Sequence, residues 1–393
     1  MRLFVILPRV PFPLEKGDKL RAFHQIKELS KKHEIILCAL NHDRKLDKKL
    51  AFKKLQPHCR SINFIDVPKV FLPYNILKAF IKGLPLQIGY FYSSLANKKI
   101  KKLFEIYKPD HVYCQLVRTA EYGKNLPVTK TIDYQDVFSY GVKRRISKAS
   151  FWLKPVLKLE YGRLVDYENA VFDIFDNKTI ISYPDRALIT HPRREEIAII
   201  PNGVDHDFFK PLDKPKKYEV VFTGNMSYPP NVDAALFLVK EIMPQVWKTF
   251  PEAKVMLAGA SPDPKVKMLA SDKVEVTGWL EDIRDAYASA KVFIAPMRIG
   301  TGLQNKLLEA MSMKIPAVTT PLANAALQAI PGEEILLGEN EVELAVNIIK
   351  LLSDNSFAEQ VAEKSYNFVL KNYSWSEATA RLAEMMEEKA GKK

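Results

Sequence analysis

The regular alternation of short apolar segments with longer amphipathic ones constrains the fold most strongly, and it runs through the chain twice. In the first series, apolar segments at residues 2–7, 34–40, 61–67, 111–116, 130–135 and 178–183 have the length of buried strands. Amphipathic segments at 18–32 and 94–108 predict helices between strands, the first with Asp18 as its N-cap. Since parallel strands need helical crossovers, the first half predicts a doubly wound α/β sheet.

The second series follows a segment at residues 201–217 that is rich in Pro, Gly and Lys and contains the turn signal Asn202-Gly203. Predicted strands at 219–224, 254–259, 274–279, 291–296 and 316–320 alternate with predicted helices that include 231–250 and 283–290. We therefore expect an α/β fold with an N-terminal domain at 1–200, a linker at 201–217 and a second domain with an open α/β sheet at 218–371.

Composition excludes several classes of protein. Of the 393 residues, 47% are hydrophobic and 27% are charged, which suits large buried cores. No uncharged apolar run reaches the roughly 18 residues of a membrane span, and "LFVIL" near the start is cut by Pro8, so it predicts a strand in place of a signal peptide. Cys38, Cys59 and Cys114 are widely spaced, which favours reduced thiols. We expect a cytoplasmic protein.

Charge is unevenly distributed along the chain. Residues 1–200 hold 37 Lys and Arg against 20 Asp and Glu, whereas residues 201–393 hold 22 against 26. The basic excess concentrates in "ANKKIKKLF" and "GVKRRISKASFWLKPVLK", where Trp152 and Leu153 lie among lysines. This pattern fits the surface of an anionic membrane, which predicts a peripheral protein of its cytoplasmic face, and it equally fits a solvated helix face. No nucleic-acid motif is present, so we expect no nucleic-acid partner.

The segment "GTGLQNKLLEAMSMKIPAVTT", residues 300–320, carries the clearest chemical signal. It follows a predicted buried strand and opens a helix, whose amino terminus attracts anions. Lys306 in the first turn has the wrong sign for the helix dipole unless an anion lies between them. Glu309 follows one turn later, about 5 Å along the helix, which suits the ribose of a nucleoside diphosphate. On this segment alone, a solvated ion pair between Lys306 and Glu309 explains the pattern as well.

Three stretches taken together carry a more specific signal than this segment alone. "IPNGVDHDFF", "FTGNMSYPPNVDAALFL" and "VTGWLEDIRDAYASAKVFIAPMRIGTGLQNKLLEAMSMKIPAVTT" resemble the retaining glycosyltransferases of family four, also called glycosyl transferase group 1. The resemblance covers nearly the whole chain and is most specific in the second half. It implies the GT-B fold, in which two Rossmann-like domains face each other across a deep cleft. It also implies that the last helix, at 372–393, crosses back onto the first domain.

The resemblance implies roles for the matching residues. Arg298 and Lys306 would neutralise the leaving nucleotide, and Glu309 would hold the ribose. The remaining donor-side positions are Gly224 and Asn225 in the first loop, Gly278, Trp279 and Leu280 at the nucleobase, and Thr301, Gly302, Leu303, Gln304 and Asn305 around the diphosphate and sugar. Acceptor-side candidates in the first domain are Gly17, Arg21, Gln115, Arg118, Asp133 and Asp136, for several of which a structural role stays open.

The chain departs from the family pattern at three places. Thr301 stands where a second glutamate usually contacts the donor sugar, and "GNMSYPPN" lacks the usual Arg and Lys after the first donor-domain strand. Gln115 replaces a histidine of the acceptor domain. These departures put the sugar contact in question and leave the positive charge of the donor site to Arg298 and Lys306.

The implied activity is transfer of a sugar from a UDP- or GDP-sugar to a hydroxyl of a glycan or lipid-linked acceptor, with retention of configuration, in cell-surface polysaccharide or glycolipid synthesis. We expect no metal and no cofactor, because Asp205-His206-Asp207 lies in the linker and the histidines lack ligand spacing. Two alternatives stay open: a sugar-nucleotide 2-epimerase of the same fold, and a non-catalytic nucleotide- or membrane-binding protein with a degenerate site. The apolar residues 71–92 either pack in the core or line a lipid-acceptor site.

Overall fold

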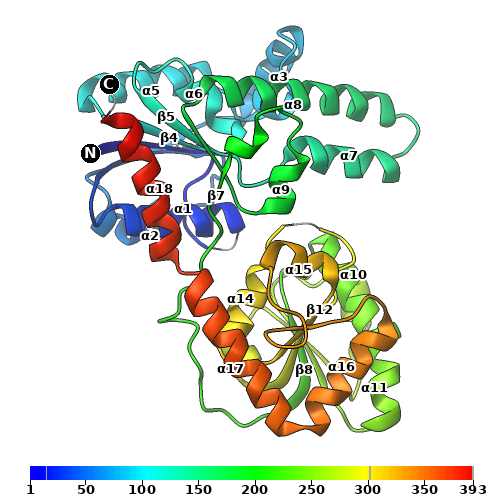
Figure 1. Ribbon diagram of the computed structural model, residues 1–393. Helices are drawn as coiled ribbons and strands as arrows, with labels where there is room; N and C mark the ends of the chain where they lie inside the picture. Colours follow the sequence, from blue (N-terminus) through cyan, green and yellow to red (C-terminus); the bar gives the residue numbers. More distant parts are fainter. Residues whose placement is uncertain (15, 301, 392–393) are drawn as a thin grey trace. The chain divides into compact units, whose positions relative to one another are not determined.

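The computed structural model describes residues 1–14, 16–300 and 302–391, and these residues divide into two compact α/β units. The first unit contains residues Met1–Pro201 and the segment that begins at Trp375, and the second contains Asn202–Ser374. Figure 1 shows helices around a sheet in each unit.

Among the described residues of the first unit, seven parallel strands form a sheet in the order β3-β2-β1-β4-β5-β6-β7. The strands are β1 (Arg2–Leu7), β2 (Glu34–Asn41), β3 (Ser61–Asp66), β4 (His111–Gln115), β5 (Thr129–Asp133), β6 (Asn177–Ile180) and β7 (Ala198–Ile199). In β1, Leu3 and Val5 face a core made with the helices Gly17–Leu29 and Trp375–Ala390, whereas Phe4 and Ile6 face a core made with the helices Ser94–Tyr107 and Lys154–Ile174. Both faces of the sheet are thus covered, as the apolar strands predict.

The helices of this unit follow the strands in alternation. They are α1 (Gly17–Leu29), α2 (Lys48–Leu55), α3 (Leu72–Ile81), α4 (Leu86–Phe91), α5 (Ser94–Tyr107), α6 (Ala120–Gly123), α7 (Phe138–Lys148), α8 (Lys154–Ile174), α9 (Tyr183–Leu188) and α18 (Trp375–Ala390), with short 3₁₀ turns η1 (Gln56–His58), η2 (Lys69–Phe71), η3 (Val117–Thr119) and η4 (Arg194–Glu196). The prediction of Asp18 as N-cap is wrong, because extended backbone at Lys16 starts α1 at Gly17. Asp18 instead lies in the first turn and pairs with Arg9.

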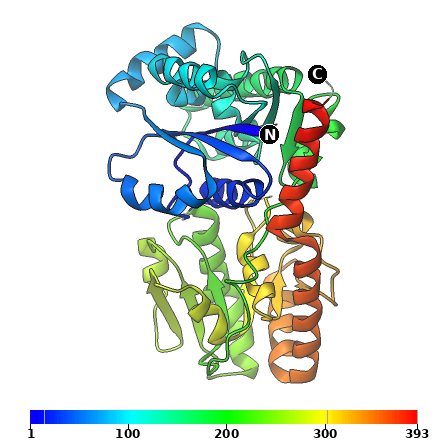
Figure 2. The same ribbon diagram turned by 90° about the vertical axis from the view of Figure 1, so that its left-hand side faces the viewer.

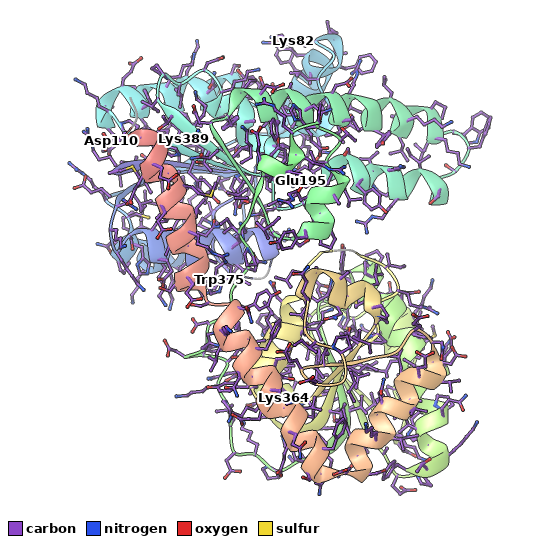
Figure 3. The ribbon with its side chains drawn as sticks, viewed as in Figure 1. Lys82, Asp110, Glu195, Lys364, Trp375 and Lys389 are labelled. Atoms are coloured by element: carbon purple, nitrogen blue, oxygen red, sulfur yellow. The ribbon has the colours of Figure 1, made fainter. Side chains whose placement is uncertain are left out.

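Helix α18 returns to the first unit and packs beside α1. The ring of Trp375 stacks on His24 with centroids 4.9 Å apart, and Leu382 and Met386 are fully buried in the core that α1 also faces. Figure 1 shows α18 in red along α1, and Figure 3 labels Trp375 and Lys389 toward the two ends of α18. Helix α18, which follows the second unit in sequence, is therefore part of the first unit's core.

Among the described residues of the second unit, six parallel strands form a sheet in the order β10-β9-β8-β11-β12-β13. The strands are β8 (Tyr218–Thr223), β9 (Val255–Ala258), β10 (Val274–Gly278), β11 (Ala290–Ala295), β12 (Ala317–Thr319) and β13 (Leu336–Leu337). The helices are α10 (Pro229–Phe237), the π-helix η5 (Leu238–Ile242), α11 (Met243–Thr249), α12 (Pro264–Lys267), α13 (Arg284–Ala288), α14 (Asn305–Ser312), α15 (Pro321–Leu327), α16 (Glu341–Ser353) and α17 (Asn355–Asn372). Figure 2 shows α17 in orange along the outside of this unit.

Where the sequence predicts a helix at 231–250, the structure has a helical segment from Pro229 to Thr249. Its middle part, η5, is π-helical.

Cys38, Cys59 and Cys114 are free cysteines, two of them fully buried. Within the described residues, no helix has both the length and the apolar character needed to cross a membrane.

Candidate functional site

The candidate site lies in the second unit, where β8 and β11 run side by side in the middle of the sheet. From β8 the chain proceeds outward to β9 and β10, and from β11 it proceeds outward to β12 and β13 on the opposite side, so the strand order reverses between β8 and β11. Ligands of open α/β sheets bind beyond the carboxyl ends of strands at such a reversal. Helix α10 begins after β8 and α14 begins after β11, which brings two helix amino termini to this edge.

Lys306, in the first turn of α14, reaches back toward the loop after β8. Its Nζ donates a hydrogen bond to Oδ1 of Asn231 at 2.6 Å and lies 4.8 Å from the centre of the Phe222 ring. Burial lowers the pKa of this ammonium to about 7, and the charge of Glu309 offsets only part of that effect. An anionic ligand would restore the charged form, because a nearby opposite charge raises the pKa of a lysine.

Glu309 lies one helical turn after Lys306 and is held by a buried tyrosine. Its Oε2 accepts a hydrogen bond from the hydroxyl of Tyr287 at 2.6 Å, and that hydroxyl lies 2.8 Å from Oγ1 of Thr223. Burial raises the pKa of the Glu309 carboxyl, which the hydrogen bond from Tyr287 and the charge of Lys306 counteract. Tyr287 thus fixes one carboxylate oxygen and leaves the second as an acceptor for a ligand hydroxyl.

Gly224 allows these groups to approach one another. Its φ of +155° is unfavourable for other residues, and an added Cβ would lie 2.7 Å from Nδ2 of Asn231 and 3.3 Å from Nζ of Lys306. The Nδ2 of Asn231 donates to the carbonyl of Asn225 at 2.9 Å. Asn231 therefore links the loop after β8 to Lys306. Sequence analysis missed Asn231 and Tyr287, whose roles depend on contacts 75 and 22 residues away along the chain.

Arg298 is held by carboxylates of its own unit. Its Nε and Nη2 bind the two oxygens of Asp233 at 3.1 and 2.9 Å, and its Nη1 lies 3.5 Å from Glu241. The hydrogen bond with Asp233 raises the pKa of this guanidinium further. The expected contact of Arg298 with the leaving diphosphate stays a prediction. It requires the guanidinium either to move away from Asp233 and Glu241 or to bind the diphosphate while it keeps these contacts.

The other donor-side positions lie at the same carboxyl edge or in the loops that follow it. Gly278 ends β10 with a φ of +71°, and Trp279 after it is 67% exposed. The loop before α14 contains Gly300 with a φ of +105°, while Thr301 falls outside the described residues.

The start of α14 is tied down locally. Gln304 donates through Nε2 to the carbonyl of Gly302 at 2.9 Å, and Asn305 accepts from Asn202 at 3.1 Å. Leu303 packs against the core of the unit. An added Cβ at Gly302 would meet no atom within 4 Å, so there is open space beside this backbone. This is the space that an anion at the amino terminus of α14 would need.

On the acceptor side, Arg21 and Asp133 form a buried ion pair in the first unit. Both side chains are 0% exposed, and Nε and Nη2 of Arg21 bind Oδ2 and Oδ1 of Asp133 at 2.7 and 3.1 Å. Thr179 donates to Oδ1 of Asp133 at 2.9 Å, and the hydroxyl of Tyr113 lies 3.0 Å from Oδ2. Neither charged side chain has surface that an acceptor could contact, so the geometry favours the structural role that sequence analysis left open.

The other acceptor-side candidates differ in exposure. Gln115 is buried and donates to the carbonyl of Asp18 at 2.9 Å. The guanidinium of Arg118 lies over the rings of Phe91 and Phe138 at 4.7 and 4.2 Å. Gly17 is exposed at the start of α1, and Asp136 is exposed after β5.

Clusters of potential metal ligands are a separate question. No group of three or more His, Cys, Asp or Glu is placed to hold a metal ion in the part of the chain that the structure describes.

Comparison with known proteins adds the family context. Residues 217–354 match the family model described as "Glycosyl transferases group 1". An uncharacterized 44.6 kDa protein in the cps region of Klebsiella pneumoniae is 21% identical over 395 residues, which covers 95% of this chain and 96% of that protein. The matched 217–354 segment contains Gly224, Lys306 and Glu309.

Solved structures resemble the chain over almost its full length. Sucrose-phosphate synthase from Thermosynechococcus elongatus superimposes with a TM-score of 0.69 at 16% identity, covering 99% of this chain and 98% of that one. Anabaena HepE in complex with UDP gives a TM-score of 0.69 at 14% identity, covering 99% and 100%. These likenesses and the two parallel sheets confirm the predicted fold of two Rossmann-like domains of the GT-B class.

Proposed function

We propose that this protein is a retaining glycosyltransferase of family four that transfers a sugar from a nucleotide-sugar to a hydroxyl of a glycan or lipid-linked acceptor. One observation carries the proposal: Lys306, held by Asn231 beside Gly224, and Glu309, held by Tyr287, lie one helical turn apart at the strand-order reversal of the second unit. A cation and a carboxylate in this arrangement match the diphosphate and the ribose of one ligand.

The chemistry follows from the charge that develops during transfer. As the glycosidic bond of the donor breaks, negative charge accumulates on the departing diphosphate, and a prepositioned ammonium at Lys306 stabilises it. Glu309 would accept hydrogen bonds from the ribose hydroxyls and hold the nucleotide in register. The crystals of Anabaena HepE with UDP and with UDP-glucose support a UDP-sugar as the first donor to test. Metal independence, the acceptor and retention are part of the proposal.

We also infer that the protein binds the surface of an anionic membrane. The connection between α7 and α8 presents Phe151, Trp152 and Leu153, and Trp152 is 81% exposed. Figure 1 shows this hairpin projecting away from the first unit's sheet. Exposed lysines at positions 143, 154 and 158 and Arg145 accompany these apolar side chains. Exposed aromatic residues among cations fit the headgroup region of an anionic bilayer.

A second apolar surface supports this inference. Val70, Tyr74, Leu77 and Ile81 recur at helical spacing along η2 and α3, and each of these side chains is more than half exposed. Of the two interpretations of residues 71–92, packing in the core fits α4, where Ile88 and Phe91 are buried, but it does not account for the exposed apolar side chains of α3. Figure 3 shows Lys82 at the outer end of α3. The relative in the cps region supports a role in cell-surface polysaccharide synthesis.

A thermal-shift panel tests the donor site directly. UDP, GDP, ADP and their sugar conjugates are added at millimolar concentration to the wild type, to Glu309→Ala and to Glu252→Ala, an exposed control in the same unit. A ligand at 100 times its Kd adds about 2.7 kcal/mol to the free energy of unfolding. We expect one nucleotide series to stabilise the wild type and the control but not Glu309→Ala. No shift with any nucleotide would contradict the proposal.

Turnover then separates the alternatives. Incubation with the donor that binds, in the absence of any acceptor, would yield an epimerised nucleotide-sugar if the protein is a 2-epimerase. Binding without consumption of donor in the presence of an acceptor library would favour the non-catalytic alternative. Transfer to an acceptor with the anomeric configuration of the donor, read by NMR of the product, is the outcome that we expect.

A further inference from the structure

The connection between β11 and α14 is attached to α10 at both of its ends. Arg298 follows the end of β11, and its Nε and Nη2 bind the two oxygens of Asp233 at 3.1 and 2.9 Å. At the other end, Nζ of Lys306 in α14 donates to Oδ1 of Asn231 at 2.6 Å. Asn231 and Asp233 both belong to the start of α10. One short helical segment therefore holds the connection on either side of the amino terminus of α14.

Arg298 lies against one face of the helical segment that begins with α10. Its guanidinium carbon is 4.1 Å from the centre of the Phe237 ring, and its Nη1 is 3.5 Å from Glu241. Asp233, Phe237 and Glu241 recur at every fourth residue, and residues at that spacing share a helix face. Four residues exceed one α-helical turn slightly, whereas the wider turn of the π-helix η5 takes more residues and keeps Glu241 on the same side.

The charges around Arg298 are unfavourable for a diphosphate. Two carboxylates, those of Asp233 and Glu241, surround one guanidinium, so the three groups together carry net negative charge. A cluster of this sign repels an anion. If the guanidinium moved to a diphosphate, it would leave both carboxylates without this partner. Lys306, by contrast, has the neutral Asn231 as its hydrogen-bond partner, which leaves its charge for a ligand.

The residue before Arg298 is also fixed. The carbonyl of Met297 accepts a hydrogen bond from Oγ1 of Thr320 at 2.7 Å, and its sulfur lies 3.9 Å from Nζ of Lys306. Beyond Arg298, Gly300 turns the chain with a φ of +105°. Holding Arg298 therefore sets the direction in which the chain leaves β11 on its way to α14. Groups that stabilise an anion work best when they are held in place before it binds.

We propose that Asp233 is a positioning residue of the donor site: together with Glu241 it holds Arg298 and so fixes the connection that leads to the amino terminus of α14. Arg298 acts on the donor through this anchor, in place of the contact with the diphosphate that the family resemblance implies. The inference rests on the proposed function, since it assigns the anchor to the donor site. The ion pair is partly exposed, and such pairs contribute little to the stability of a whole domain, so its effect is local.

Hydrogen–deuterium exchange of the full chain without nucleotide tests the anchor by itself. The variants are Asp233→Asn and Arg298→Lys, because lysine keeps the charge but lacks the planar fork that binds both carboxylate oxygens. The control is Glu333→Gln, which removes a carboxylate from another ion pair of the second unit, that with Lys364. We expect the peptide that contains Gly302 and Leu303 to exchange about tenfold faster in both variants and at the wild-type rate in the control. Wild-type exchange of this peptide in Asp233→Asn overturns the proposal.

Nucleotide affinity then separates positioning from contact. UDP, GDP or ADP, whichever stabilises the wild type, is titrated calorimetrically into each protein. We expect Asp233→Asn, Arg298→Lys and Arg298→Gln each to bind about tenfold more weakly. The double variant Asp233→Asn/Arg298→Gln should bind no more weakly than either single one, because both changes break the same anchor.

Direct contact of Arg298 with the diphosphate predicts the opposite for Asp233. Removing its negative charge would then leave the affinity unchanged or raise it, and Arg298→Lys would keep most of the binding. Either result overturns the proposal. So does a loss of affinity that is matched by a lower midpoint of urea unfolding in Asp233→Asn but not in Glu333→Gln, since that would assign the pair to the stability of the fold.

The two measurements fail separately from the proposed function. If no nucleotide binds the wild type, the proposed function fails, while faster exchange in Asp233→Asn still shows the anchor. If a nucleotide binds the wild type and Asp233→Asn equally well, the donor site stands and the positioning role of Asp233 fails.

Discussion

At the scale of single residues, the protonation state of Lys306 couples the proposed donor site to pH. Its pKa is about 7 because its ammonium is buried against Phe222 and Met297, with Asn231 as a neutral hydrogen-bond partner. In the free protein the lysine is therefore charged below pH 7 and loses its proton above it. A bound diphosphate raises this pKa, so the complex keeps the proton at pH values at which the free protein has lost it.

Donor binding should consequently take up a proton. We expect about half a proton at pH 7, rising toward one at pH 8, with an affinity that falls as the pH rises above 7. Calorimetric titration of the nucleotide-sugar in two buffers with different ionisation enthalpies measures the uptake. Lys306→Arg keeps the charge at every pH of the experiment, so it should show no uptake in this range. The same uptake in Lys306→Arg would assign the proton to another group.

Gly224 should tolerate no side chain. Gly224→Ala places a Cβ 2.7 Å from the amide of Asn231 at a φ of +155°, so we expect a loss of about 1–3 kcal/mol in the free energy of unfolding together with the loss of nucleotide stabilisation. Gly162→Ala in α8 is the control: its Cβ meets no atom within 4 Å, and alanine favours a helix. Urea denaturation measures both variants. Wild-type stability and nucleotide binding in Gly224→Ala would show that this close approach is dispensable.

At the scale of elements, the α7–α8 hairpin and the stripe along η2 and α3 expose apolar side chains that folding alone does not explain. Hydrophobic residues scattered singly on a surface are ordinary, whereas adjacent exposed aromatic residues flanked by cations mark an interaction surface. Arg163 of α8 lies over the Phe80 ring of α3 at 4.5 Å, so these two elements contact each other within the first unit.

Vesicle binding should depend on both the apolar tip and the cations. We expect the protein to co-sediment with vesicles that contain anionic lipid at low salt. Trp152→Ala should bind about tenfold more weakly, and neutralising Lys143, Arg144 and Arg145 should cost about 1 kcal/mol per charge. Met268→Ala, which removes a similarly exposed apolar side chain from the second unit, is the control. Binding that is indifferent to lipid charge, or no binding at low salt, would remove the membrane inference.

At the scale of the whole molecule, the two units have separate cores, and α18 belongs to the first although it follows the second in sequence. Trp375 is buried and stacked on His24, so Trp375→Ala should cost the first unit about 3 kcal/mol. Trp247 packs against the core of the second unit and donates to the carbonyl of Ala253 at 2.8 Å. Trp247→Ala is therefore the corresponding destabilising variant of the second unit.

Differential scanning calorimetry distinguishes the two units. We expect Trp375→Ala to lower one unfolding transition and Trp247→Ala to lower the other, since multidomain proteins depart from two-state unfolding. A bound nucleotide should raise the transition that Trp247→Ala lowers, because the proposed donor-side residues, Lys306 and Glu309 among them, belong to the second unit. A single transition that both variants lower equally would mean that the units unfold together.

The amino-acid sequence by itself determined the two parallel sheets and the place of Lys306 and Glu309 on one helix. Apolar periodicity and helix spacing act over a few residues, so both can be read along the chain. Only the tertiary structure decided which side chains form hydrogen bonds and ion pairs with Lys306, Glu309 and Arg298. Asn231 reaches Lys306 across 75 residues, Tyr287 reaches Glu309 across 22, and Arg298 is engaged by Asp233.

The same division applies to the first unit. Arg21 and Asp133 are 112 residues apart, so nothing local in the sequence distinguishes their buried ion pair from two exposed acceptor contacts. A cavity beside Tyr90 likewise exists only because the carboxyl ends of β1 and β2 lie side by side in the sheet and the end of α4 closes it. Secondary structure follows from the spacing of residues along the chain, whereas burial and ionisation follow from neighbours that only the folded sheet brings together.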